Sequence, residues 1–495
     1  MSETTTGNGG RTTGGPCTFV IFGVTGDLAS RKLLPALYRL QVGGELDPGS
    51  RTIGFARSEL SSEALRAELR GCLLEELDDP DEQVLDDLLG RVDYLRGGYD
   101  DADSYARLAE AVKTAGSPRR IFYTATPPSA YLDIASGLAG VGLDRAPEGG
   151  FARLVLEKPF GNDLASAKSL NVRLLELFEE SQLYRIDHYL AKETAQNLAV
   201  LRFANTVFEP LWNNRYIDHV QITMSEDIGV AGRGSFYEQA GVLRDVFQNH
   251  LLQLLALVAM EPPARFDAEA VRDEKVKLFR SVTCPGLDDL VLGQYTAGNG
   301  EVGYRQEPDV ADASRQSTFA ALRLRVRNWR FSGTPFYLRS GKQLEAKASE
   351  VVLHFRNPPH VPFDLARPLR PDRLILRLVP DEGITLRFNG KRPGQKIDLA
   401  RVDLDFSYEE TFDRPNPDAY ETLLLDVMQG DATLFMRADE VEAQWAIFTP
   451  LLRQIEAHAI EPFPYPAGGP GPEEAFALLE REDRYWHRPD AVRES

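Results

Sequence analysis

The sequence Phe19-Val20-Ile21-Phe22-Gly23-Val24-Thr25-Gly26-Asp27-Leu28-Ala29 is the strongest indication of how this chain folds. Its apolar residues run straight into a glycine-rich turn, as in a strand that is buried on both faces. An apolar stripe follows and stops at Gly43-Gly44, which indicates a helix. A strand, a tight glycine turn and a helix N-terminus together bind pyrophosphate, because glycines let the backbone approach the anion. The spacing G-x-x-G-x-x-A is not the standard one, so an ordinary tight turn is the alternative.

The next predicted strand ends at Arg57, and this residue bears on which dinucleotide would bind. A site that prefers NAD needs a carboxylate here for the ribose 2′-hydroxyl, whereas an arginine offers a planar donor fork to a 2′-phosphate. The sequence therefore favours NADP, with NAD as a secondary cofactor because Glu59 is near. A surface arginine after a strand is the alternative interpretation.

From residue 17 to about 187, short apolar runs alternate with amphipathic stretches. This is the βαβ rhythm of a doubly wound parallel sheet, in which ligands bind beyond the carboxyl ends of the strands. Polar clusters follow three of these runs, at residues 124–128, 157–161 and 187–188, and we expect them to face one crevice. The predicted strands are 17–22, 51–56, 93–96, 119–125, 152–157 and 184–187, and the predicted helices are 61–77, 101–115, 129–140 and 163–180.

The segment Tyr184-Arg185-Ile186-Asp187-His188-Tyr189-Leu190-Ala191-Lys192-Glu193 holds an acid, an imidazole, a phenol and an ammonium. Residues four apart share one face of a helix, so a helix here would join His188 and Lys192 into a basic patch. Such a patch suits a phosphate monoester. A solvated helix start is the alternative.

After about residue 210 the pattern changes to strict alternation, as in residues 322–327, 374–378 and 402–406. Period two indicates an antiparallel sheet with one face less buried. We expect a Rossmann-like domain at 17–187, an α+β domain with a large, mainly antiparallel sheet at 188–495, and a disordered tail at 1–16. The sheet edges of the second domain favour homo-oligomers. Further strands are predicted at 216–226, 289–295, 349–356 and 384–388, and closing helices at 418–429 and 439–457.

Residues 236–260 read as one long helix that is apolar on all sides and therefore buried. It nevertheless carries polar residues, and each buried polar group without a partner costs about 1–3 kcal/mol. They either form a satisfied core network or line a cavity. His250 is the best candidate for a general base, because an imidazole titrates near working pH and a carboxylate can hold its tautomer.

Composition limits the function classes. The chain has 495 residues, which suggests two or three domains. Its net charge of −19 argues against nucleic acid or an anionic membrane as the main partner. Three scattered cysteines give neither a disulfide framework nor a metal-binding spacing, which fits the cytoplasm. No apolar run is long enough to cross a membrane, and we expect no metal site.

Several long motifs in sequence order resemble the glucose-6-phosphate dehydrogenase family. They are the glycine turn at 23–29, Glu157-Lys158-Pro159-Phe160-Gly161, residues 185–190, residues 244–253 and Leu338-Arg339-Ser340-Gly341-Lys342. The resemblance covers about residues 17 to 488. It implies an NADP-dependent oxidoreductase that oxidises glucose 6-phosphate at C1 to 6-phospho-glucono-1,5-lactone, the entry step of the pentose phosphate pathway. A homodimer or homotetramer is expected.

The resemblance also implies residue roles. His250 would take the C1 hydroxyl proton, and Asp187 would stabilise the imidazolium that forms. In the family, the peptide that precedes the matching proline, here Pro159, is cis. The implied substrate-binding residues are Lys158, His188, Tyr189, Lys192, Glu226, Asp245, Lys342 and Lys347, and the implied cofactor-binding residues are Gly23, Thr25, Gly26, Asp27, Leu28, Arg57, Tyr123 and Lys158.

Two departures from the family pattern and two competing hypotheses stay open. Val379 stands where many relatives carry glutamine, so one sugar contact is in doubt, and the segment 384–394 does not support a second, structural NADP. A sugar oxidoreductase of the inositol-dehydrogenase type would not need the basic residues His188, Lys192 and Lys347. A dinucleotide sensor without catalysis would not need a base.

Overall fold

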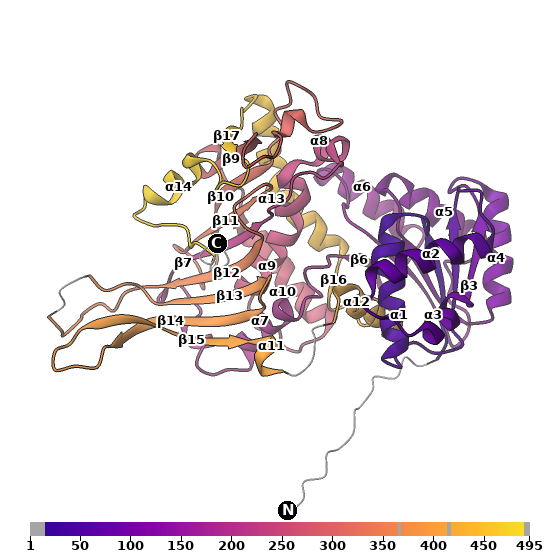
Figure 1. Cartoon of the computed structure of the whole chain (residues 1–495), viewed down its shortest axis with the longest axis horizontal. Coiled ribbons are helices and arrows are strands. Elements are labelled where there is room, and N and C mark those ends of the chain that lie inside the picture. The colour runs from indigo at the N-terminus through magenta and orange to yellow at the C-terminus, as the bar shows by residue number, and fades with distance from the viewer. Residues whose placement is uncertain (1–14, 365–367, 413–416, 490–495) are drawn as a thin grey trace, which may run out of the picture. The chain divides into compact units, whose positions relative to one another are not determined.

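The computed structural model describes residues 15–364, 368–412 and 417–489, and the predicted tail lies outside them except for its last two residues (Figure 1). The chain forms two compact units. Unit 1 comprises residues 1–161, 165–191 and 417–438, and unit 2 comprises residues 162–164, 192–416 and 439–495. None of the described helices is both long and apolar enough to span a membrane.

Unit 1 is built on a seven-stranded sheet with the order β16-β6-β5-β4-β1-β2-β3. Strands β1 to β6 pair in parallel, and the short β16 pairs antiparallel with β6 at the edge. The structure confirms the predicted doubly wound parallel sheet. Its strands are β1 (Thr18–Phe22), β2 (Arg51–Ala56), β3 (Val92–Arg96), β4 (Arg119–Thr124), β5 (Phe151–Leu156), β6 (Leu183–Ile186) and β16 (Phe435–Met436).

Several helices of unit 1 begin at residues whose side chains accept backbone N–H groups. Ser61, Asp81 and Asp101 cap α2, α3 and α4 in this way, as expected for N-cap residues. Helix α3 was not predicted from the sequence. The helices are a π-helix (Ala29–Leu33) that continues into α1 (Leu34–Val42), α2 (Ser62–Glu76), α3 (Glu82–Leu89), α4 (Ala102–Ala115), α5 (Tyr131–Gly140), α6 (Leu164–Leu175) and α12 (Ala419–Gln429).

Helix α12 belongs to unit 1, although the sequence predicts residues 188–495 as one domain. Two half-buried arginine side chains explain this difference. Arg119 Nη2 donates to the carbonyl oxygen of Met428 at 2.8 Å, and Arg153 Nη1 donates to the same oxygen at 3.0 Å. Cations at a helix C-terminus satisfy its last carbonyls and its dipole. Strands β4 and β5 therefore hold the end of α12, and β16 then pairs with β6.

Unit 2 is built on a ten-stranded sheet with the order β15-β14-β13-β12-β7-β11-β10-β9-β17, and β8 pairs with β10. Most pairs are antiparallel, as predicted, but β7–β11 and β9–β17 are parallel. The strands are β7 (Ile217–Ser225), β8 (Val282–Thr283), β9 (Leu290–Thr296), β10 (Phe319–Val326), β11 (Pro335–Gly341), β12 (Ala348–Phe355), β13 (Arg373–Val379), β14 (Gly383–Lys391), β15 (Leu399–Ser407) and β17 (Phe463–Pro466).

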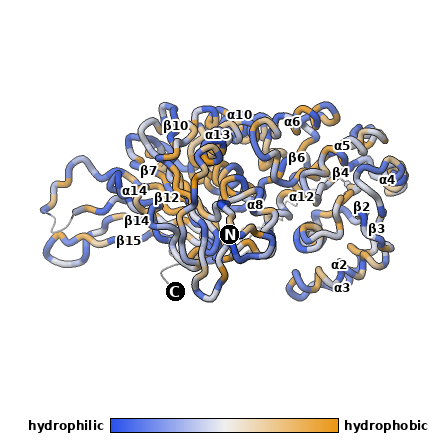
Figure 2. Tube along the Cα trace, turned by 90° about the horizontal axis from the view of Figure 1, so that it is seen from above, coloured by the Kyte–Doolittle hydropathy of each residue, from blue (hydrophilic) through white to orange (hydrophobic). Residues whose placement is uncertain are grey.

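The centre of this sheet is buried and its edge is not. Nearly every residue of the central strands β7 and β12 is buried. Their hydrophobic residues, orange in Figure 2, alternate with buried polar ones. The edge strand β15 instead exposes Val402 and Leu404. The helices of unit 2 are α7 (Glu193–Phe203), α8 (Gly234–Val242), a π-helix (Leu243–Leu251), α9 (Leu252–Ala259), α10 (Ala268–Ser281), α11 (Tyr408–Thr411), α13 (Ala438–Ala457) and α14 (Glu473–Glu480).

Candidate active site

Five strand ends of unit 1 bring candidate site residues to one edge of the sheet. Because β1, β2, β4, β5 and β6 run parallel, the residues that follow them lie at the same carboxyl edge. The glycine turn follows β1, and the other four strands end next to Arg57, Ala125, Glu157 and Asp187. The structure therefore brings the predicted polar clusters of unit 1 together, with the order reversal of the sheet between β1 and β4.

The glycine turn after β1 is shaped for close approach of a ligand. Gly23 has φ +79°, and a Cβ at this position would lie 2.3 Å from the carbonyl oxygen of Ala125. The turn closes through a bond from Gly26 N–H to the Gly23 carbonyl at 2.9 Å, which leaves Thr25 and Asp27 exposed. Only glycine fits at Gly23, so this turn provides the cradle that a dinucleotide pyrophosphate requires.

Arg57 and Glu59 differ in how available they are to a ligand. The Arg57 side chain is exposed, with its guanidinium carbon 5.7 Å from the centre of the Tyr99 ring, and it has no acidic partner among the described residues. The Glu59 carboxylate instead accepts from Arg96 Nη1 at 3.0 Å. The free guanidinium therefore fits a 2′-phosphate better than the paired carboxylate fits a ribose hydroxyl.

The turn after β5 contains Glu157, for which the sequence predicts no role. Tyr123 donates its hydroxyl to Glu157 Oε1 at 2.5 Å, and Tyr420 of α12 also bonds to this carboxyl. Removal from water raises the pKa of Glu157, although the two phenols and Lys158 act in the opposite direction. Tyr123 is itself buried. The Lys158–Pro159 peptide is cis, which confirms the expectation from the resemblance.

The residues after β6 form a turn, so the helix on which a shared face of His188 and Lys192 would depend does not form here. Asp187 Oδ1 accepts from Tyr189 N–H at 3.0 Å, and the Asp187 carbonyl accepts from Leu190 N–H. A carboxylate that bonds the backbone two residues on stabilises a turn against a helix. Helix α7 begins only at Glu193, and Lys192 is its extended N-cap residue in unit 2. His188 and Lys192 therefore share no helix face.

The predicted helix at 236–260 is interrupted in unit 2. Gly241 has φ +59° and ψ 174°, which breaks α8 from the π-helix. Backbone bonds in a π-helix run from residue i to i+5. Residues five apart, such as Asp245 and His250, would be separated by about 140° around an α-helix but lie closer to one face here. A regular α-helix with 100° per residue, as the sequence predicts here, does not have this arrangement. Asn249 and His250 are buried, as the composition of the stretch predicts.

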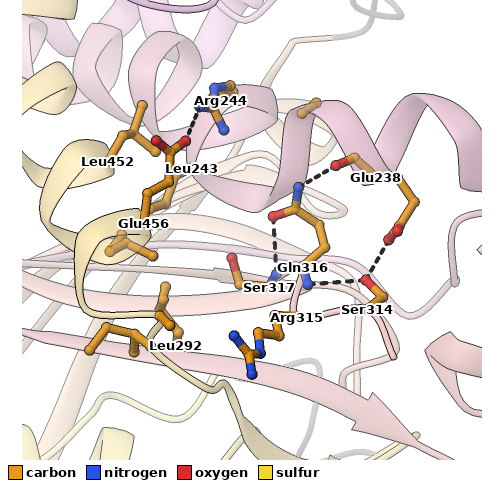
Figure 3. Close-up of a pocket in the computed structure, with 14 residues that line it drawn as sticks. Glu238, Leu243, Arg244, Leu292, Ser314, Arg315, Gln316, Ser317, Leu452 and Glu456 are labelled. Atoms are coloured by element: carbon orange, nitrogen blue, oxygen red, sulfur yellow. Dashed lines mark hydrogen bonds and ion pairs between the residues drawn. The ribbon is translucent and has the colours of Figure 1, made fainter. Parts of the chain in front are cut away.

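A hollow of about 390 Å³ lies beside the break between α8 and the π-helix (Figure 3). Gln316 points from its loop toward α8, and its Nε2 donates to the Glu238 carbonyl at 2.7 Å. A Cβ on Gly241 would lie 2.2 Å from Gln316 Oε1. Gln316 therefore supports the break. None of the predicted site residues lines this hollow. Arg244, which precedes Asp245 in the chain, does line it.

Three strand ends of unit 2 collect the predicted sugar-binding residues. Glu226 follows β7, Lys342 follows β11, and Lys347 precedes β12, while β7 pairs with both other strands. Lys342 is 2% exposed and forms an ion pair with Glu226, whereas Lys347 is exposed. The π-helix packs against β7 and β11. This sheet end therefore carries Glu226 and Lys342 beside the helix that bears Asp245 and His250.

A buried hydrogen-bond network holds α9, the helix that continues from the π-helix. Gln253 of α9 donates to Glu440 Oε1 at 2.7 Å and accepts from Lys275 Nζ at 3.0 Å. The alternative that the polar residues of this stretch belong to a satisfied core network therefore holds for Gln253.

Comparison with known proteins gives one family for the whole chain. Residues 20–197 match the model of the glucose-6-phosphate dehydrogenase NAD binding domain, and residues 199–487 match that of its C-terminal domain. Glucose-6-phosphate 1-dehydrogenase of Chlamydia pneumoniae is 43% identical over 95% of this chain and 96% of its own length. The enzyme of Mycolicibacterium smegmatis is 45% identical over 95% of this chain and 97% of its own.

Solved structures agree with this result. A glucose-6-phosphate dehydrogenase in complex with its substrate glucose 6-phosphate has a TM-score of 0.89 and 36% identity, over 96% of this chain and 99% of that one. Glucose-6-phosphate 1-dehydrogenase from Mycobacterium avium has a TM-score of 0.84 and 36% identity over the same shares. The chain belongs to the glucose-6-phosphate dehydrogenase family.

Proposed function

We propose that this chain oxidises the C1 hydroxyl of glucose 6-phosphate to 6-phospho-glucono-1,5-lactone with NADP as the hydride acceptor, as the entry step of the pentose phosphate pathway. The observation that carries the proposal is the set of groups in unit 2, where the π-helix that bears His250 packs against the strands that present Glu226 and Lys342. Family membership over 95% of the chain supports the same reaction.

Oxidation of an alcohol removes a hydride from carbon and a proton from oxygen. The nicotinamide of NADP, when bound, accepts the hydride. Neutral His250 takes the proton from the C1 hydroxyl, and the carboxylate of Asp187 stabilises the imidazolium that results. Both roles come from the family resemblance, and the burial of both residues supports them because a base works best when water does not compete.

The other groups bind and orient the sugar phosphate. We assign the 6-phosphate to His188, Tyr189, Lys192 and Lys347, since a chain of net charge −19 needs local cations to hold a dianion. Glu226, Asp245 and Lys342 bind sugar hydroxyls, and Lys158 contacts both ligands.

The dinucleotide lies at the carboxyl edge of the unit 1 sheet in this proposal. The cradle at Gly23 fits a pyrophosphate because a Cβ there would meet the Ala125 carbonyl. Arg57 holds the 2′-phosphate and confers the preference for NADP over NAD. The remaining proposed contacts come from Thr25, Gly26, Asp27, Leu28, Tyr123 and Lys158.

We also propose a cytoplasmic homodimer or homotetramer. An Arabidopsis thaliana relative with 41% identity is named a cytoplasmic enzyme. The exposed apolar side chains Val402 and Leu404 of β15 support association, because exposed apolar side chains on one sheet face favour contact with another chain. Light scattering of the purified protein measures the state, and a monomer at micromolar concentration would contradict the proposal.

Absorbance at 340 nm tests the reaction directly. The protein is mixed with glucose 6-phosphate and either NADP or NAD, and we expect rapid reduction with NADP and slower reduction with NAD. The same assay with unphosphorylated glucose serves as the control for the phosphate-binding residues. Folded protein that reduces neither cofactor would overturn the proposal and favour a cofactor sensor or another sugar oxidoreductase.

A further inference from the structure

Five buried tyrosines of unit 2 share one aromatic core, and four of them have partners for their hydroxyls. Tyr295 donates to Glu307 at 2.9 Å, Tyr304 to Glu238 at 2.6 Å, and Tyr337 to Glu482 at 2.7 Å. Tyr465 donates to the Lys342 carbonyl at 2.6 Å. The fifth is Tyr237 of α8. Its hydroxyl is buried and has no hydrogen-bond partner among the described residues.

This exception is physically costly. Tyr237 is 2% exposed, so water does not reach its hydroxyl, whose hydrogen-bonding capacity is therefore lost on folding. Buried polar groups in folded proteins nearly always have a partner, and those that lack one tend to occur where a ligand, a water or a functional constraint explains them. A phenylalanine would fill the same space without this cost. The hydroxyl of Tyr237 therefore requires a reason.

The surroundings of Tyr237 indicate that reason. The Lys342 ammonium lies 5.5 Å from the centre of the Tyr237 ring. Burial raises the pKa of the Tyr237 phenol well above its ordinary value, and the negative charges of Asp245 and Glu226 raise it further. The hydroxyl therefore lies within the field of the three residues to which we assign the sugar hydroxyls.

We propose that the Tyr237 hydroxyl forms a hydrogen bond with a ring hydroxyl of the bound sugar phosphate. This inference rests on the proposed function and adds a substrate contact to it. In the free protein, Lys342 and Glu226 pair with each other. A sugar that takes up both groups with its hydroxyls separates this pair, and one of its hydroxyls then reaches the phenol beside them. The buried hydroxyl therefore lowers the stability of the free protein, and it gains a hydrogen-bond partner when the substrate binds.

The variant Tyr237→Phe tests this contact because two of its effects have opposite signs. The midpoint of thermal unfolding of the free protein should equal or exceed that of the wild type, since an unpartnered hydroxyl is removed. The dissociation constant for glucose 6-phosphate by calorimetry, and its KM, should rise about three- to thirtyfold, as for one lost hydrogen bond. The KM for NADP should stay within twofold. A residue that only stabilises the fold would not separate these quantities.

Tyr304→Phe provides the matched control. Tyr304 is 0% exposed and its ring centre lies 6.1 Å from that of Tyr237, but its hydroxyl already bonds to Glu238. Its loss should lower the thermal midpoint and leave the affinity for glucose 6-phosphate within twofold. If Tyr237→Phe lowers the midpoint as Tyr304→Phe does, or leaves the affinity for the sugar phosphate unchanged, the contact does not exist.

Deoxy sugars identify the partner hydroxyl. The 2-, 3- and 4-deoxy analogues of glucose 6-phosphate are each titrated into wild type and Tyr237→Phe, which makes a cycle between one protein hydroxyl and one ligand hydroxyl. One analogue should bind equally to both proteins, and a penalty that persists with all three overturns the contact. Wild-type protein that neither binds nor oxidises glucose 6-phosphate would remove the proposed function, whereas an active wild type with an unchanged Tyr237→Phe affinity removes only this inference.

Discussion

At the scale of single residues, the proposed chemistry depends most on the His250 ring. His250→Asn keeps a polar side chain of related shape but has no group that can accept a proton near neutral pH. We expect turnover to fall by about 10²–10⁴, the range for a lost general base, with binding of glucose 6-phosphate largely kept. Steady-state kinetics and calorimetry measure the two quantities. Near-normal turnover of a folded variant would remove His250 from the mechanism.

Lys192 tests the phosphate assignment. Lys192→Ala removes one cation from the proposed phosphate set, so the KM for glucose 6-phosphate should rise about tenfold or more with a smaller change in turnover. Lys113→Ala is the control, because Lys113 lies near the C-terminal end of α4, outside every proposed contact. Activity with free glucose should not respond to Lys192→Ala. Equal losses for the free and the phosphorylated sugar would contradict a phosphate role.

Arg57 tests the cofactor preference. Arg57→Ala removes the guanidinium, so the 2′-phosphate of NADP loses a charge-assisted contact. The KM for NADP should therefore rise about tenfold or more, and the KM for NAD should stay nearly unchanged. Arg145→Ala, at a side chain that is 88% exposed, controls for the loss of a surface charge. An unaltered ratio of kcat/KM for NADP and NAD would show that Arg57 does not read the 2′-phosphate.

Single-residue predictions from the sequence succeed where a residue is adjacent to a readable pattern. Gly23 and Arg57 follow predicted strands, so their place at the sheet edge could be expected from strand order alone. Tyr420 carries no such signal. It lies more than 260 residues from Glu157 in the chain, and only the docking of α12 on unit 1 brings the two together.

At the scale of elements, the break at Gly241 sets where the π-helix begins, and it can be tested by adding one methyl group. The backbone at φ +59° and ψ 174° is one that only glycine adopts readily, and the added Cβ would meet Gln316 Oε1. We expect Gly241→Ala to destabilise the protein by about 1–3 kcal/mol from backbone strain, and more from the clash. It should also lower turnover, since the helix that carries His250 would shift.

Gly232→Ala is the control for this change. Gly232 also has a positive φ, +74°, but a Cβ there meets nothing within 4 Å. Urea unfolding gives both free energies, and the difference between the variants reports the contact with Gln316. A Gly241→Ala protein as stable and active as Gly232→Ala would show that the break does not position the catalytic helix.

The sequence predicts helices and strands correctly where the apolar residues recur at a single, regular spacing. The alternating runs became β10, β13 and β15, within a few residues of the expected bounds. The stretch at 236–260 is apolar on all sides, so its pattern cannot distinguish α from π geometry or reveal the break. At residues 187–192 a turn forms instead of a helix, because the Asp187 carboxylate accepts a hydrogen bond from the nearby backbone.

At the scale of the whole molecule, the excursion of residues 417–438 into unit 1 could not be expected from the sequence. An amphipathic helix shows which face it buries but not which sheet it covers. The choice is made by Arg119 and Arg153, which bond the last carbonyls of α12. The division of the chain by sequence order therefore placed this segment with unit 2.

The stability of the whole protein should depend on pH through two stacked histidines in unit 2. The rings of His219 and His354 lie 4.0 Å apart, and both side chains are buried. Burial lowers the pKa of both, more than the Asp218 carboxylate can raise that of His219. Arg373 and Arg484 disfavour a proton on His219. A proton on His354 is disfavoured by His219 first, and then by Arg373, His487 and Arg401. The folded protein therefore keeps both rings neutral where an unfolded chain would charge them.

The sign of the effect follows from proton uptake. Below the ordinary histidine pKa of about 6.5, the unfolded chain binds protons that the folded protein does not, so acid favours unfolding. We expect the free energy of unfolding to fall between about pH 6.5 and 5, by up to about 1.4 kcal/mol per pH unit for each ring. The pKa of Asp218 is lowered despite its burial, because His219 and Arg484 bond it. The contribution of Asp218 to stability is lost only at more acid pH, below this window.

Urea unfolding at several pH values measures how steeply the free energy of unfolding falls with pH. This slope should be smaller in His354→Gln but unchanged in His360→Gln, because the His360 ring is exposed. Equal slopes in both variants would show that the stacked pair does not control the acid stability of this protein.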